Sequence, residues 1–184
     1  MAVQLMLICG SVRAGSTNAA TLACAAELLP DGCTALNYQS LGELPHFNPD
    51  LDVDPLPAPA AELRRAIGES AGLLFCTPEY AGALPGSFKN LLDWTIGGGE
   101  MSGKPVGWIN CSDRGAAGAY AELRTVLSYA DTVIVEAACA RIPVRRSELA
   151  ADGSITDPLI RAQLAGVVQA LAAAHSAENL TRDI

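Results

Sequence analysis

Five short apolar runs, separated by longer stretches with a helical pattern, constrain the fold of this 184-residue chain most strongly. Continuous apolar runs of this length are typical of strands that are buried on both faces. Strands that alternate with helices predict an α/β domain, with a five-stranded parallel sheet and helices on both sides. The expected strands are Val3–Cys9, Cys33–Tyr38, Gly72–Thr77, Lys104–Asn110 and Thr132–Ala138. The expected helices lie at about 18–29, 60–70, 86–96 and 116–129, and a last helix is capped by Asp157 and begins at Pro158.

The chain has no internal repeat and no linker between these elements, so we expect a single domain over residues 1–184. Half of the residues are hydrophobic, which is enough for a core and excludes disorder of the whole chain. The prolines and aspartates of Pro45–Pro59 predict an extended loop with little regular structure. Residues from about 176 to 184 are expected to form a flexible C-terminal tail.

Charge and cysteine usage narrow the class of protein. With 12 basic and 20 acidic residues the net charge is −8, so we expect neither a nucleic-acid nor a membrane partner. The first apolar run is too short for a membrane span or a signal-peptide core, which predicts a cytoplasmic protein. The six cysteines include no C-x-x-C pair and only two histidines are present, so no metal site is expected. The cysteines are interpreted as small buried hydrophobic residues of a reducing compartment.

The turn after the first expected strand, Gly10–Asn18, has the composition of a phosphate site. In parallel sheets, ligands bind beyond the carboxyl ends of the strands. A turn rich in Gly, Ser and Thr that opens a helix presents backbone N–H groups at the positive end of the helix dipole. Helix capping alone is the alternative. Four hydroxyl or amide side chains and one arginine within eight residues exceed what a cap needs.

Two common nucleotide motifs are absent from this turn. A P-loop requires a lysine where Ser16 stands, which argues against nucleotide hydrolysis. The dinucleotide fingerprint lacks its second glycine, because Ser11-Val12 occupies that place. The second expected strand ends in Tyr38-Gln39, with no acid for a ribose hydroxyl. A ligand with a single phosphate remains compatible with the turn.

A second segment, Thr77–Trp94, connects the third expected strand to a helix. It begins with a stiff proline and offers a tyrosine ring and several backbone N–H groups, which suits the edge of a flat heteroaromatic ring. The alternative is a plain strand–loop–helix connection in which Phe88 and Trp94 belong to the core.

Taken together, the two segments resemble the signature motifs of the NADPH-dependent FMN reductase family. The similarity in order and spacing covers roughly residues 3–170. The matching residues are Gly10-Ser11-x-Arg13-x-x-Ser16-x-Asn18, and Thr77-Pro78-Glu79-Tyr80 with Pro85-Gly86-x-x-Lys89-Asn90-x-x-Asp93-Trp94. The resemblance implies a flavodoxin-like fold with strand order 2-1-3-4-5, FMN bound non-covalently, and a homodimer or homotetramer.

The resemblance also implies site residues, none of them metal ligands. The flavin phosphate would be held by Ser11, Arg13, Ser16, Thr17 and Asn18. The ring would be lined by Pro78, Glu79, Tyr80 and Ala81, mostly through backbone groups, and Ser112 of a third loop would join the site.

Two departures from the family pattern concern the same site. Many relatives have Asn where this chain has Ala81, so any contact from that side chain is lost. The third loop, Cys111–Gly118, is usually richer in glycine, and Asp113 and Arg114 add bulk and charge near the pocket. Arg114 is a candidate contact for the 2′-phosphate of NADPH, with an ordinary exposed loop arginine as the alternative.

These observations predict an enzyme, an NAD(P)H-dependent FMN oxidoreductase. NADPH or NADH would give hydride to the flavin N5, and the electrons would pass to a small acceptor such as a quinone, azo compound, metal oxyanion or free flavin. Because the flavin carries the chemistry, no catalytic acid or base is assigned. One alternative is a flavodoxin-like carrier of electrons reduced by a protein partner, which the acidic surface would suit. Another is a binding domain without flavin.

Overall fold

The computed structural model describes residues 2–182, and the side chains as far as His175. In this part of the chain, five parallel strands form one sheet in the order β2-β1-β3-β4-β5. The fold class and strand order expected from the sequence are therefore confirmed. The strands are β1 (Val3–Cys9), β2 (Cys33–Tyr38), β3 (Gly72–Cys76), β4 (Pro105–Asn110) and β5 (Val133–Arg141).

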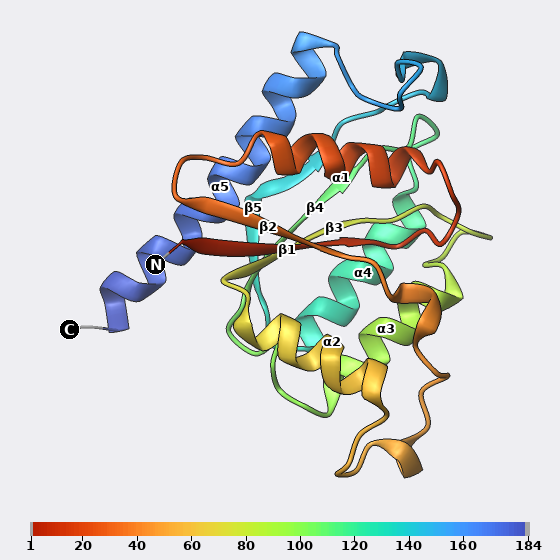
Figure 1. Ribbon diagram of the computed structural model, residues 1–184, viewed down its shortest axis with the longest axis vertical. Helices are drawn as coiled ribbons and strands as arrows, with labels where there is room; N and C mark the ends of the chain where they lie inside the picture. The colour runs from red at the N-terminus through yellow and green to blue at the C-terminus, as the bar shows by residue number, and fades with distance from the viewer. Residues whose placement is uncertain (1, 183–184) are drawn as a thin grey trace.

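Helices cover both faces of the sheet, as Figure 1 shows. Helices α1 and α5 pack on one face, and α2, α3 and α4 lie on the other, so the molecule has three layers. Each face has its own apolar core, and every residue of the central strand β3 is buried between them. The helices are α1 (Thr17–Glu27), α2 (Ala58–Glu69), α3 (Gly86–Ile96), α4 (Ala117–Tyr129) and α5 (Pro158–Arg182).

Strand β5 extends further than the expected Ala138, because its pairing with β4 is irregular. Val106 pairs with Ile134, but Trp108 already pairs with Cys139, so β5 bulges between these positions. At Gly107 a Cβ atom would lie 2.6 Å from the carbonyl oxygen of Ala138. The bulge of β5 therefore packs directly on Gly107 of β4. The apolar pattern of β5 gives no sign of this bulge.

The segment expected as an extended loop contains one short 3₁₀ turn, Pro49–Leu51, and is fixed to α3. The Asn90 amide and the Trp94 indole both donate to the Pro45 carbonyl, at 2.9 and 2.8 Å. The Phe47 N–H donates to Asn90 Oδ1 at 2.8 Å, and the Phe47 ring meets Trp94 edge-on at 5.1 Å. Two residues of the family motif on α3 thus hold this loop in place.

The end of the chain was expected to be a flexible tail. The backbone of α5 is described to Arg182, whereas residues 183–184 lie outside the described residues. The mobility of residues 176–184 stays a prediction. Among residues 2–182, none of the helices combines the length and the apolar composition of a membrane span.

Candidate functional site

Three loops meet at the carboxyl edge of the sheet, as the parallel topology predicts. They follow β1 (residues 10–16), β3 (residues 77–85) and β4 (residues 111–116). The β3 and β4 loops, the start of α1 to which the β1 loop leads, and Val144 after β5 line a cavity of about 340 Å³, here called the three-loop cavity, which has the size of small-molecule sites. Its lining residues are Thr17, Asn18, Pro78, Glu79, Cys111, Ser112, Asp113, Arg114, Ala116 and Val144.

The β1 loop presents the positive end of α1 to this edge of the sheet. Ser16 is the N-cap residue of α1, and its Oγ accepts hydrogen bonds from the Asn18 backbone N–H at 3.2 Å and from Asn18 Nδ2 at 3.3 Å. Both side chains are buried, and the first turn of α1 contains no acidic residue. The capping role is therefore real. It leaves an uncompensated helix N-terminus with hydroxyl and amide donors, which suits an anion.

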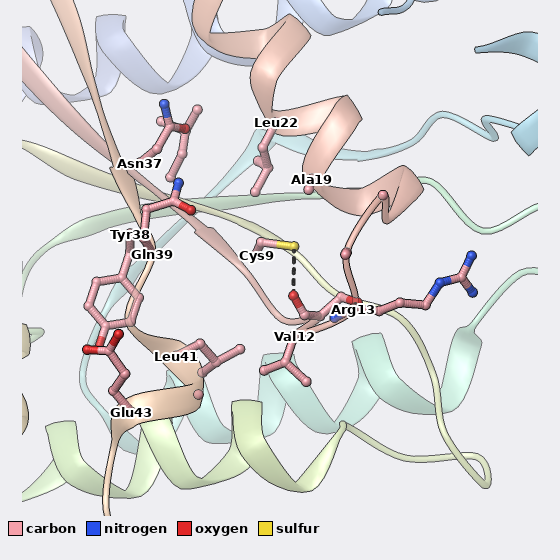
Figure 2. Close-up of a pocket in the computed structure, with 15 residues that line it drawn as sticks. Cys9, Val12, Arg13, Ala19, Leu22, Asn37, Tyr38, Gln39, Leu41 and Glu43 are labelled. Atoms are coloured by element: carbon pink, nitrogen blue, oxygen red, sulfur yellow. Dashed lines mark hydrogen bonds between the residues drawn. The ribbon is translucent and has the colours of Figure 1, made fainter. Parts of the chain in front are cut away.

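The predicted phosphate ligands are divided between two cavities. Thr17 and Asn18 line the three-loop cavity, whereas Ser11 and Arg13 line a second cavity of about 460 Å³ on the β2 side of the loop. Figure 2 shows this second cavity between the loop and the end of β2, with the exposed Arg13 side chain turned away from it. Ser16 lines neither cavity. The assignment of these residues to a phosphate stays a prediction.

The β3 loop ends in a tight turn at its tip. The backbone groups of Tyr80 and Ala83 pair in both directions, at 3.0 and 3.1 Å. The two central residues, Ala81 and Gly82, have φ angles of 52° and 79°, as in a type I′ turn. Asn-Gly is the pair that such turns favour, so the Asn of the family pattern has a conformational reason, and the Ala81 of this chain is strained there.

The tip of this turn points out of the three-loop cavity. Tyr80 is 54% exposed, and neither Tyr80 nor Ala81 lines the cavity, whereas Pro78 and Glu79 do. That Tyr80 and Ala81 line a bound ring therefore stays a prediction.

Glu79 caps a helix of another segment. The N-cap residue of α4, Ala116, has a φ of 48° and offers no side-chain hydrogen bond. Glu79 Oε2 instead accepts a hydrogen bond from the Ala119 N–H in the first turn, at 3.0 Å. A carboxylate at a helix N-terminus is favourable electrostatically, so Glu79 fixes the β3 loop to α4.

Two further side chains of α4 hold the same loop, and neither was identified from the sequence. The buried Tyr120 hydroxyl accepts from the Thr77 N–H at 3.1 Å and donates to the Ile109 carbonyl at 2.6 Å. Burial raises the pKa of Tyr120 well above its usual value, which keeps this donor protonated. Glu122 Oε2 accepts from the Leu84 N–H at 2.8 Å. Their partners are backbone groups, which leave no signature in a sequence.

The β4 loop is folded around Asn110. The Asn110 amide donates to the Gly115 carbonyl, and its Oδ1 accepts from the Ser112 N–H at 3.1 Å. Ser112 Oγ in turn accepts from the Arg114 N–H at 3.2 Å. Asp113 and Arg114 are exposed and line the three-loop cavity, so their charges lie near the pocket, as expected from the sequence. No group of three His, Cys, Asp or Glu side chains in the described residues could hold a metal ion.

A five-stranded parallel sheet of order 2-1-3-4-5 with helices on both faces defines a flavodoxin-like α/β protein. Residues 3–143 match the sequence pattern of the NADPH-dependent FMN reductase family. The chain belongs to this family of flavin-dependent oxidoreductases, whose cofactor is FMN and whose reductant is NAD(P)H.

Individual relatives are similar over most of their length. A 2-hydroxy-1,4-benzoquinone reductase of Burkholderia sp is 33% identical over 160 residues, which are 84% of this chain and 86% of the relative. An NAD(P)H-dependent FMN reductase of Pseudomonas aeruginosa is 30% identical over 173 residues, 92% of this chain and 93% of the relative. The structure of a flavoenzyme NAD(P)H:(acceptor) oxidoreductase from Paracoccus denitrificans superposes with a TM-score of 0.77 at 29% identity, covering 95% and 97% of the two chains.

Proposed function

We propose that this protein passes electrons from NADPH or NADH, through FMN bound in the three-loop cavity, to a small acceptor of the quinone class. One observation carries this proposal: a single cavity joins the positive end of α1 to the β3 loop and the β4 loop. The relative from Burkholderia is named as a benzoquinone reductase, which supports a quinone over an azo compound, a metal oxyanion or free flavin as the first acceptor to test.

The residues that line the cavity fit the phosphate and the ring of FMN. A phosphate fits the helix N-terminus at Thr17 and Asn18, which supplies neutral N–H, hydroxyl and amide donors. The backbone at Pro78 and Glu79, together with Ser112, would hold the ring. When bound, FMN supplies the redox chemistry, since it takes a hydride from a nicotinamide and returns two electrons to an acceptor. The neutral donors also explain how a chain of net charge −8 can bind a phosphate, because local N–H dipoles act at short range.

The contribution of the protein is position. Glu79, Tyr120 and Glu122 hold the β3 loop on α4, so the ring-binding backbone is fixed before a ligand arrives. A preorganised loop costs little further ordering on binding. No side chain of the cavity is needed as a proton donor for this scheme.

The test is anaerobic reduction of the reconstituted protein. Purified protein mixed with FMN should quench the flavin fluorescence, and NADPH or NADH should then bleach the flavin absorption. Adding a benzoquinone should restore the absorption without any protein partner. Failure to bind FMN, or bound FMN that neither nicotinamide bleaches, would contradict the proposal. Reduction only through a partner protein would favour the carrier, which the reductase relatives already make the weaker candidate. The homo-oligomer and the cytoplasmic location stay predictions.

Removing two of the predicted phosphate ligands, Arg13 and Ser16, should reduce the affinity for FMN more than it reduces the stability of the fold. Arg13 and Ser16 do not line the three-loop cavity, but the exposed Arg13 side chain can turn toward a bound anion and Ser16 holds the Asn18 amide. For the double variant Arg13→Ala, Ser16→Ala we therefore expect the Kd for FMN to rise roughly 10- to 100-fold, since a hydrogen bond to a charged group contributes about 1.5–3 kcal/mol. Loss of the Ser16 cap should lower the free energy of unfolding by about 1 kcal/mol. Fluorescence titration and urea unfolding measure the two effects. Arg65→Ala, an exposed arginine on α2, is the control, and an unchanged Kd in the double variant would remove the phosphate assignment.

A further inference from the structure

Two cysteine thiols lie directly beneath the phosphate end of the three-loop cavity. Cys76 is the last residue of β3, and Cys111 follows the end of β4. Their sulfur atoms are 3.7 Å apart, and both reach the side-chain oxygen of Asn18, at 3.3 and 3.2 Å. Because Asn18 Oδ1 accepts from the thiols, its Nδ2 is turned toward Ser16 Oγ. The thiol pair therefore sets the orientation of an amide at the proposed phosphate site.

The two thiols differ in access. Cys76 is fully buried, whereas Cys111 lines the three-loop cavity and retains 3% of its surface. When Cys111 loses its proton, the single S–H of Cys76 can donate to the Cys111 sulfur instead of to Asn18, which lowers the pKa of Cys111, and burial opposes this effect. Burial raises the pKa of Cys76 well above its usual value. Cys111 is thus the sulfur that a small oxidant reaches from the cavity and the one of the two that ionises more readily, with Cys76 next to it.

A third cysteine nearby is turned to the other side of the loop. Cys9 is the partner of Cys76 in the β1–β3 register, so its backbone is close. Its thiol, however, lines the second cavity and donates to the Ser11 carbonyl at 3.6 Å, as the dashed line in Figure 2 shows. The sulfur contact of Cys76 is with Cys111, which singles out this pair.

We propose that Cys76 and Cys111 are a redox-sensitive pair, and that their oxidation to a disulfide weakens FMN binding. The inference rests on the proposed FMN site. The oxidant is a hydroperoxide, with hydrogen peroxide as the simplest case. The Cys111 thiolate attacks one peroxide oxygen and the O–O bond breaks, giving a sulfenic acid and hydroxide. The Cys76 sulfur then attacks the Cys111 sulfur and expels its hydroxyl as water. In sum, two thiols and one H₂O₂ give one disulfide and two waters.

The disulfide changes the phosphate end in two ways. It has no S–H group, so Asn18 Oδ1 loses both of its donors and the amide is no longer held with Nδ2 toward Ser16. The sulfurs must also approach from 3.7 Å to about 2.05 Å, which moves the ends of β3 and β4 beneath α1. Both changes act on the first turn of α1, where the phosphate is proposed to bind.

The experiment compares reduced and peroxide-treated protein before FMN is added. In the wild type, peptide mapping by mass spectrometry should find Cys76 linked to Cys111, with the loss of two hydrogens. The Kd for FMN, from fluorescence quenching, should rise at least tenfold on oxidation and return to its starting value after treatment with a reductant. Neither readout requires turnover.

Variants identify the pair. Cys76→Ser and Cys111→Ser should each abolish the peroxide response, measured as the ratio of oxidised to reduced Kd within each variant. Cys33→Ser, at the distant start of β2, should keep it. If the serine variants do not fold, the wild-type cycle of oxidation and reduction decides alone. A disulfide with unchanged Kd, a link to Cys9, or no link at all would overturn the inference. Reduced wild type that does not bind FMN would instead overturn the proposed function.

Discussion

Replacing Arg64 with methionine is expected to lower the free energy of unfolding by about 3–5 kcal/mol, the usual cost of removing one partner of a buried ion pair. The Arg64 side chain is only 10% exposed, with Nη2 at 2.6 Å from Asp52 Oδ1. Its Nε donates to the Trp94 carbonyl at 2.8 Å and lies 4.0 Å from Glu100 Oε2. Methionine would replace the aliphatic stem but would leave two largely buried carboxylates without this cation.

The neighbouring arginine provides a matched control. Arg65 is also 2.6 Å from a carboxylate, that of Glu69, but the two side chains are 61% and 58% exposed. Exposed pairs of this kind contribute about 0.3–0.5 kcal/mol, so Arg65→Met should change stability by no more than this. Urea unfolding of both variants measures the difference. Equal losses would mean that burial does not determine the energetic importance of the Arg64 pair.

The sequence was most informative where local composition decides the structure. The continuous apolar residues of β1 and β3 predicted strands buried on both faces, and the turn rich in Gly, Ser and Thr predicted a helix from about residue 18, one residue after α1 begins. The parallel topology then required the loops after β1, β3 and β4 to lie at one edge. The three-loop cavity is the result, and its position was predictable without any knowledge of individual contacts.

Contacts between distant segments were not predictable. Glu79 caps α4 from another loop, and Arg64 pairs with an aspartate twelve residues earlier across a proline-rich segment. Neither pairing follows from spacing, because the partner is chosen by the tertiary fold. At Ala81 the difficulty is local. A left-handed φ is unfavourable for alanine, so an alanine at this position gave no sign of the type I′ turn. Asn90 and Trp94 belong to the family motif that was identified in the sequence. Their contacts with the 45–57 loop were nevertheless not predicted from it.

The contact between the β3 loop and α4 leads to the second large effect, that of Gly118→Ala. A Cβ atom at Gly118 would lie 2.1 Å from the Gly82 carbonyl oxygen, 3.0 Å from its carbon and 3.1 Å from Glu79 Oε2. The carbonyl belongs to a tight turn and cannot move alone, so the loop and the helix must separate. We expect a loss of about 1–3 kcal/mol in the free energy of unfolding, the typical cost of overpacking. The Kd for FMN should rise at least about tenfold in the folded variant, a change of 1.4 kcal/mol.

Gly166 on α5 distinguishes this effect from a general cost of adding a methyl group. Nothing lies within 4 Å of a Cβ at that position, so Gly166→Ala should stabilise the protein by about 0.5–1 kcal/mol and leave the Kd for FMN unchanged. Urea unfolding and fluorescence titration of both variants provide the comparison. A Gly118→Ala variant that loses stability but binds FMN with wild-type affinity would show that the loop can shift on α4 without harm to the site. The hydrogen bonds of Glu79, Tyr120 and Glu122 would then stabilise the fold without positioning the cofactor.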